Sequence, residues 1–166
     1  MIPVPINIVL AELVPHEYTN TCQVKAQDLE KGWQPMKEIY EYLKNCGTFY
    51  LATVEGDKPQ VRPFGAVCEF EGKLYFVTNN QKEVYKQMKA NPNVAICGMY
   101  KGKWIRVSGE VEEDTRREAR VAMMDANTAA LSEMYTVDDN LMTVFKFVNG
   151  KGTVYSFTEA PVEYSL

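Results

Sequence analysis

The chain is poor in the residues that most often build metal and acid–base sites. It has a single histidine, His16, and four cysteines without any C-x-x-C pair. We therefore expect neither a histidine metal centre nor catalysis by a histidine acid or base. The cysteine spacing also fits no zinc or redox motif. We expect Cys22, Cys46, Cys68 and Cys97 to be small buried side chains in a reducing compartment.

Several other signatures are missing as well. The sequence contains no G-x-G-x-x-G, Walker, G-x-S-x-G or H-E-x-x-H motif. The acidic loop 136–140 lacks calcium-loop spacing, so we expect it to be solvated and predict no metal site. No apolar run is long enough to span a membrane. The net charge is −4, and no stripe of lysine or arginine dominates any segment. We expect a cytoplasmic protein whose partners include neither a membrane nor a nucleic acid.

What is present suits one folded domain. The 166 residues are 46% hydrophobic and 24% charged, which is enough for one core of ordinary size. Residues 1–35 differ from the remainder, because their start carries Pro3, Pro5 and Pro15 and lacks the basic segment of a signal peptide. We predict a weakly structured arm over residues 1–35 and a domain over residues 36–166.

The patterns along residues 36–166 predict short antiparallel strands and a few helices. The predicted helices cover residues 36–46, 82–90 and 115–135. The predicted strands cover residues 48–55, 60–70, 73–78, 93–100 and 104–114, followed by a hairpin over 141–158 with a type I′ turn at Asn149–Gly150. Because no βαβ unit repeats, this order predicts a mainly β fold, an antiparallel barrel rather than a doubly wound sheet.

Arg62 is the anomaly of the strand predicted over residues 60–70. Alternation places it among apolar neighbours, where a guanidinium is costly unless it meets an anion. Both faces of this strand are mostly apolar, so we expect the barrel core to cover one and a ligand or a second subunit to cover the other. The alternative is that Arg62 lies near the wet end of the strand and is solvated.

The start of the next helix is a second candidate site. Asn79 or Asn80 could cap it, and Asn80 with Glu83 resembles a capping box. The positive charge of Lys82 interacts unfavourably with the helix dipole at the N-terminus. An anion bound at the same place would interact favourably with the dipole and with Lys82. Together with Thr78 and the free N–H groups, Lys82 makes a plausible phosphate site. We expect Arg62 and Lys82 to converge on one phosphate.

Three stretches carry a family resemblance: FYLATVEGDKPQVRPFGAV, GKLYFVTNNQKEVYKQMKANPNVAI and GKWIRVSGEVEED. In this order they resemble the pyridoxamine 5'-phosphate oxidase-like flavoproteins, which bind FMN on a split β-barrel, usually as homodimers. The resemblance implies an antiparallel split β-barrel with flanking helices, FMN as cofactor and a homodimer. The cofactor-binding residues that it implies are Arg62, Pro63, Phe64 and Gly65 along the flavin ring and ribityl chain, Val77, Thr78, Asn79, Asn80 and Lys82 at the phosphate end, and Trp104 and Arg106 on a further strand.

Within this family the compact chain resembles the nitroimidazole-resistance-like and general flavin reductase members. The resemblance implies an FMN-dependent oxidoreductase that reduces a small acceptor with NAD(P)H. The C-terminal SFTEAPVEYSL lacks the Arg-and-His segment of authentic pyridoxamine-phosphate oxidases, so we do not expect pyridoxal phosphate formation. A non-catalytic electron carrier or flavin store is the alternative. Haem binding, known in split-barrel relatives, lacks an obvious axial histidine here, and no catalytic side chain is identified.

Overall fold

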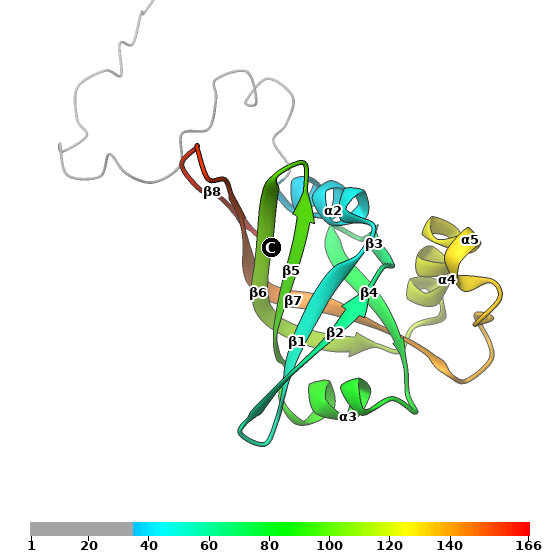
Figure 1. Cartoon of the computed structure of the whole chain (residues 1–166). Coiled ribbons are helices and arrows are strands. Elements are labelled where there is room, and N and C mark those ends of the chain that lie inside the picture. The colour runs from blue at the N-terminus through cyan, green and yellow to red at the C-terminus, as the bar shows by residue number, and fades with distance from the viewer. Residues whose placement is uncertain (1–34) are drawn as a thin grey trace, which may run out of the picture.

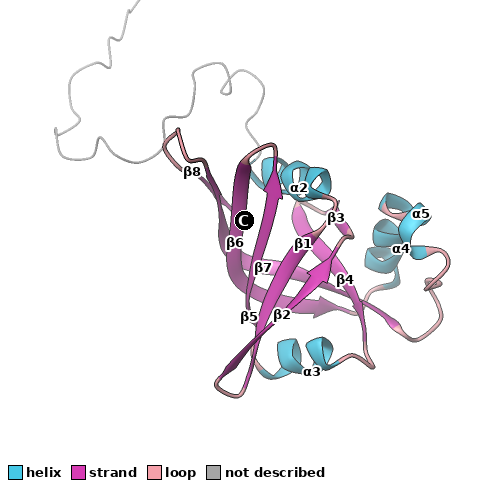
Figure 2. Ribbon diagram, in the orientation of Figure 1, coloured by secondary structure: helices cyan, strands magenta, loops and turns pink. Residues whose placement is uncertain are grey.

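The computed structural model describes residues 35–166, which form one curved antiparallel sheet and four helices (Figures 1 and 2). The helices are α2 (Pro35–Cys46), α3 (Glu83–Ala90), α4 (Arg117–Ala126) and α5 (Thr128–Leu131). The strands are β1 (Phe49–Glu55), β2 (Lys58–Phe64), β3 (Val67–Phe70), β4 (Lys73–Asn79), β5 (Asn93–Tyr100), β6 (Lys103–Asp114), β7 (Met142–Tyr155) and β8 (Val162–Ser165). The predicted arm lies outside the described residues except for Pro35, so its boundary stays a prediction.

The strand order is β2-β1-β5-β6-β7-β4-β3, with β8 paired on β7. The sheet curls so that β2 and β3, the two ends of this order, lie at the open seam of a split barrel (Figure 1). The predicted fold class is therefore confirmed. Among the described residues, none of the helices is long and apolar enough to cross a membrane.

The barrel interior is filled by apolar side chains and closed by a helix at each end. α2 places Ile39 and Leu43 in the core, with 0% and 1% of their surfaces exposed. α3 contributes Val84 and Met88 from the opposite end (Figure 1). Phe76 lies at the centre and contacts the rings of three other phenylalanines. α2 therefore covers one end of the barrel as a lid.

A second apolar cluster lies outside the barrel, where α4 and α5 pack against β3, β4 and β7 (Figure 2). The single helix predicted over residues 115–135 is wrong in one respect, since it breaks at Asn127. The Asn127 amide donates to the carbonyls of Met123 (3.1 Å) and Val67 (3.0 Å). An asparagine side chain that bonds nearby carbonyls competes with the helical ladder, so the chain turns and continues as α5.

The segment predicted as one strand over residues 60–70 belongs to two strands in the structure. β2 ends at Phe64 and β3 begins at Val67, and they pair with β1 and β4 respectively. A side chain at Gly65 would meet the carbonyl oxygen of Gly47 at 3.1 Å, so the backbone passes close to the end of α2 here. The break carries the chain from one side of the open seam to the other.

The hairpin predicted at Asn149–Gly150 is also wrong, because β7 runs unbroken through both residues. The register against β6 shifts at Glu110, where Val148 is the extra residue of a bulge. Asn149 Oδ1 accepts the Glu110 N–H at 3.1 Å. The second half of β7 pairs with β8, a strand that the sequence patterns did not predict.

Candidate functional site

Arg62 turns its guanidinium toward neutral groups of the barrel. Nη1 donates to Thr53 Oγ1 at 2.6 Å and to the Gln60 carbonyl at 3.2 Å, and Nη2 donates to Gln87 Oε1 at 2.6 Å. Burial lowers the pKa of Arg62, and Glu55 acts in the opposite direction. The guanidinium thus joins β2 to β1 and α3, an arrangement that neither of the two expected alternatives described.

Thr53 and Gln87 complete this network, and sequence reasoning missed both. They are 2% and 7% exposed, and the Thr53 hydroxyl donates to Gln87 Oε1 at 2.6 Å. Gln87 lies between Val84 and Met88 on the buried side of α3. A polar residue inside that apolar stripe was the signal that could have identified it.

Thr78, a predicted phosphate ligand, is buried without a hydrogen-bond partner. It is 2% exposed and lies opposite Thr143 on β7, which is 9% exposed. Among the described residues, the buried side-chain nitrogen and oxygen atoms without a partner are the hydroxyls of these two threonines. An unpaired buried hydroxyl costs about 1–3 kcal/mol, which a bound polar ligand could offset.

The loop that leads into α3 leaves the start of the helix uncapped. The predicted capping box is wrong, because the N-cap position is Lys82 and no side chain caps the helix. Asn79 Oδ1 accepts the N–H two residues later, and Asn80 Nδ2 donates to a backbone carbonyl before β7. Glu83 pairs with Lys86 at 2.7 Å instead of reaching back. Free N–H groups and an ammonium group therefore remain at this end of the helix.

Trp104 and Arg106 lie on the outside of the barrel wall. They alternate along β6 with Ile105 and Val107, which are fully buried in the core. The Trp104 ring stacks on Tyr155 with centroids 5.4 Å apart, and the Arg106 guanidinium lies 5.8 Å above the same Tyr155 ring.

These two residues belong to a broad apolar surface, which we call the outer sheet face. Residues that share it by direct cross-strand pairing are Pro63, Tyr50, Cys97, Arg106, Val61, Ala52, Ala95, Ser108, Met99 and Trp104. Tyr50, Val61 and Met99 are 52%, 64% and 63% exposed, and a hollow of about 310 Å³ opens on this face. Such apolar exposure is typical of an interaction surface.

The cysteines only partly follow expectation. Cys68 is buried, and burial raises the pKa of its thiol to about 12. Cys46 is half-buried at the end of α2. Cys97, which we expected to be buried, is exposed on the outer sheet face, because alternation along β5 turns it away from the core. Cys22 and His16 lie outside the described residues.

The structure does not bring all the predicted cofactor residues together. Thr78 lies opposite Thr143 on β7, whereas Arg106 lies opposite Thr153, ten residues further along the same strand. At about 3.3 Å per residue, that is a path of roughly 30 Å. Thr78 is also buried beside the core, whereas Arg106 is on the outer face.

The remaining predicted residues divide between these places. Val77 is buried against the α4 side, and the Phe64 ring packs on Phe49 and Phe76, with centroids 6.1 Å and 5.8 Å away. Pro63 is exposed on the outer sheet face. Arg62 reaches α3, the helix that follows Lys82, but the groups that it contacts are neutral acceptors rather than an anion-binding cluster.

Residues 35–153 match the family model described as pyridoxamine 5'-phosphate oxidase. The chain is similar to a NimC/NimA family protein from Clostridium acetobutylicum, with a TM-score of 0.76 and 53% identity over 80% of this chain and 94% of that one. A pyridoxamine 5'-phosphate oxidase-related, FMN binding protein from Nostoc punctiforme has a TM-score of 0.51 and 13% identity, covering 89% of this chain and 98% of its own.

A heme binding protein from Mycobacterium smegmatis has a TM-score of 0.59 and 16% identity, covering 76% of this chain and 57% of its own. At such identities the likeness to the Nostoc and Mycobacterium structures shows only a common fold. No curated protein matches the chain.

Proposed function

Because this chain belongs to the pyridoxamine 5'-phosphate oxidase family, we propose that it binds FMN and reduces a small acceptor, with NADH or NADPH as the donor. The observation that carries the proposal is the unpartnered buried hydroxyl of Thr78, at the end of β4, beside the uncapped start of α3. Hydroxyls, free N–H groups and a lysine are the groups that bind a phosphate at a helix N-terminus.

The phosphate end of the cofactor is held by Lys82, by the first N–H groups of α3 and by the Thr78 hydroxyl. The Lys82 ammonium has no hydrogen bond or ion pair among the described residues, so it is free to meet a phosphate. Asn79 fixes the turn through its 3.0 Å bond to the N–H two residues later. Val77 and Asn80 flank the same loop, before and after β4 ends.

The ring end of the cofactor lies along residues 62–65. Among the described residues β2 pairs with no strand other than β1, so one side of this edge strand is open. Pro63 has no N–H, and the Phe64 ring is engaged in the core. The chain therefore offers backbone groups at Phe64 and Gly65, rather than side chains, to orient the polar edge of the ring.

When bound, FMN supplies the redox chemistry, while the chain supplies binding, orientation and electrostatics. The C-terminal strand β8, with sequence VEYS, brings neither an arginine nor a histidine to the site. We therefore propose that the chain does not form pyridoxal phosphate. A carrier or flavin store is the second candidate, because the described site presents no side chain committed to acid–base catalysis.

Anaerobic reduction separates the enzyme from the carrier. We expect NADH or NADPH to bleach the absorbance of the FMN-loaded protein in stopped flow, and a quinone or nitroaromatic acceptor to restore it. Free FMN at the same concentration is the control, because the protein must accelerate both steps. A flavin untouched by either nucleotide, with no acceptor increasing turnover, would leave a binding module. Oxidation of pyridoxamine phosphate would refute the exclusion of pyridoxal phosphate formation.

We further propose a symmetric homodimer that buries the outer sheet face. The exposed apolar side chains of Tyr50, Val61 and Met99 lie together there, and an isologous contact would cover them on both copies. The dimer also accounts for the divided site, since Trp104 and Arg106 of one copy could reach the flavin that the other copy holds. Arg106 has no carboxylate partner among the described residues.

A charge placed on the outer sheet face should break this dimer. Met99→Glu puts a carboxylate into the proposed contact, where desolvation without a partner is costly, so we expect the monomer mass in light scattering at micromolar concentration. Met134→Glu is the matched control, because Met134 is 61% exposed but lies beyond α5. A parent protein with the mass of a monomer would contradict the dimer.

A further inference from the structure

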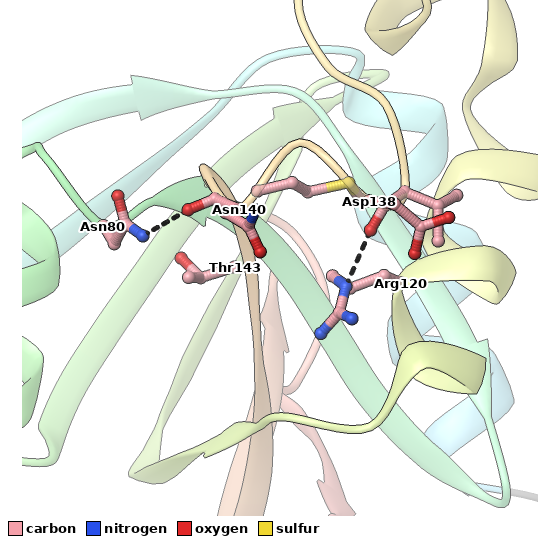
Figure 3. A pocket seen from close by; sticks show the side chains of 7 residues that line it. Asn80, Arg120, Asp138, Asn140 and Thr143 are labelled. Atoms are coloured by element: carbon pink, nitrogen blue, oxygen red, sulfur yellow. Dashed lines mark hydrogen bonds between the residues drawn. The ribbon is translucent and has the colours of Figure 1, made fainter.

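A polar cavity lies outside the barrel, where α4, the loop before β7 and the loop after β4 meet. Its volume is about 220 Å³ (Figure 3). The residues that line it are Asn80, Arg120, Val137, Asp138, Asn140, Met142 and Thr143. The acidic loop 136–140, which we expect to be solvated, is mostly exposed and forms one wall of this hollow.

Arg120 is held in place at this cavity by backbone groups. Nε donates to the Val137 carbonyl and Nη1 to the Thr115 carbonyl, both at 2.9 Å. These bonds fix the plane of the guanidinium and leave Nη2 without a partner among the described residues. No carboxylate among the described residues lies within ion-pair distance of Arg120. A fixed guanidinium with free N–H groups is suited to an oxyanion.

The two nearest acidic residues are already engaged. Asp138 accepts hydrogen bonds from Arg117 Nε at 2.9 Å and Nη2 at 2.8 Å. Asp139 accepts the N–H groups of Thr136, Leu141 and Met142 at 2.7–2.9 Å. Neither carboxylate therefore neutralises Arg120 by direct contact, although both lie near enough for Arg120 to lower their pKa values.

Two further polar groups at the cavity are unsatisfied. The Asn140 carbonyl accepts Asn80 Nδ2 at 2.7 Å, but the Asn140 side-chain amide makes no hydrogen bond to the described residues. Figure 3 shows Asn140 and Arg120 on opposite sides of the open space. The Thr143 hydroxyl, buried and unpartnered, lies in the same wall.

We propose that this cavity binds a small oxyanion, a carboxylate or phosphate group, between the Arg120 guanidinium and the Asn140 amide. The volume admits one such group with its substituent, and the anion completes the ion pair that Arg120 lacks. The site is separate from the flavin proposal and does not rest on it, although Asn80 lies beside both.

Calorimetric titration tests the site in FMN-saturated and in flavin-free protein, with inorganic phosphate and with acetate at constant ionic strength. We expect at least one of the two anions to bind, and Arg120→Gln to weaken binding about tenfold or more. Lys103→Gln is the control for net charge, since Lys103 lies at the start of β6, away from the cavity, and pairs with Glu159. It should leave the affinity unchanged.

Asn140→Gly guards against misfolding, because Asn140 has a φ of 57° that glycine adopts easily. This variant should fold like the parent but lack the side-chain amide, and it should bind the anion several-fold more weakly. Binding of phosphate alone points to a phosphate ester, and binding of acetate alone points to a carboxylate. Three results would overturn the site: no binding of either anion, equal anion affinity in Arg120→Gln and the parent, or anion binding that FMN abolishes. Failure of FMN itself to bind would leave this result intact.

Discussion

Replacing Asp114 with alanine should lower the free energy of unfolding by roughly 3 kcal/mol. Asp114 is 5% exposed, and it accepts the Tyr75 hydroxyl at 2.8 Å and Arg116 Nη2 at 2.7 Å. Breaking a buried pair costs about 3–5 kcal/mol. We expect a loss at the lower end of this range, because the Arg116 side chain is 45% exposed and retains its ion pair with Glu71 at 2.8 Å. Urea denaturation of the purified variant measures the loss.

Asp138→Ala is the matched control for this loss. Asp138 also pairs with an arginine, Arg117, at 2.8 Å, but the two side chains are 64% and 58% exposed. Exposed ion pairs contribute about 0–1 kcal/mol, so this variant should unfold nearly like the parent. Equal losses in both variants would show that burial does not set the strength of the Asp114 pair.

The Asp114 carboxylate should also make the stability of the fold depend on pH. Hydrogen bonds from Arg116 hold the pKa of Asp114 well below its usual range, although burial opposes them. A depressed folded-state pKa contributes stability that is present above the unfolded value of about 4 and is lost as pH falls below it. The parent should lose stability on acidification, and Asp114→Asn should lose less of it over the same range.

The local features of this fold were readable from the sequence because their causes are local. Glu71 and Gly72 have φ values of 50° and 71°, which is the conformation that a two-residue hairpin turn needs. The same reasoning failed at Asn149–Gly150, although the residue pair is typical of a turn. A bulge also suits glycine, and the choice between the two depends on β6, a strand nearly forty residues away.

The break between β2 and β3 escaped prediction for a similar reason. Every residue of the segment 60–70 is compatible with one strand, and the pattern does not say that its halves pair with different neighbours. The close approach of Gly65 to Gly47 involves the chain just after α2. Such a contact joins elements that only the folded chain brings together.

At the site, sequence reasoning identified Arg62 as unusual but not its partners. A buried guanidinium needs acceptors, and residue pattern alone does not show that they are neutral. Thr53 and Gln87 come from β1 and α3, two elements separated by three strands in sequence. The unpartnered hydroxyl of Thr143 was missed because it becomes informative only when it is paired with Thr78.

Lys82→Ala should weaken FMN binding about tenfold or more, because a charge-assisted contact contributes roughly 1.5–3 kcal/mol. Fluorescence titration of the apoprotein with FMN measures the affinity. Lys86→Ala is the matched control, since Lys86 lies on the same helix but pairs with Glu83 at 2.7 Å. An unchanged affinity in Lys82→Ala, or an equal loss in both variants, would remove Lys82 from the phosphate site.

Arg62→Ala should weaken FMN binding by a similar factor, and Gln87→Leu shows by which route. In the structure the guanidinium is held by Thr53 and Gln87 at 2.6 Å each, which joins the strand at the ring end to the helix at the phosphate end. If Arg62 acts by holding these elements together, Gln87→Leu should weaken FMN binding as well, because it removes the bond to α3. If Arg62 contacts the flavin directly, Gln87→Leu releases the guanidinium and should leave the affinity unchanged or higher. We expect the first result, since every acceptor that Arg62 has in the structure is a neutral group of the barrel.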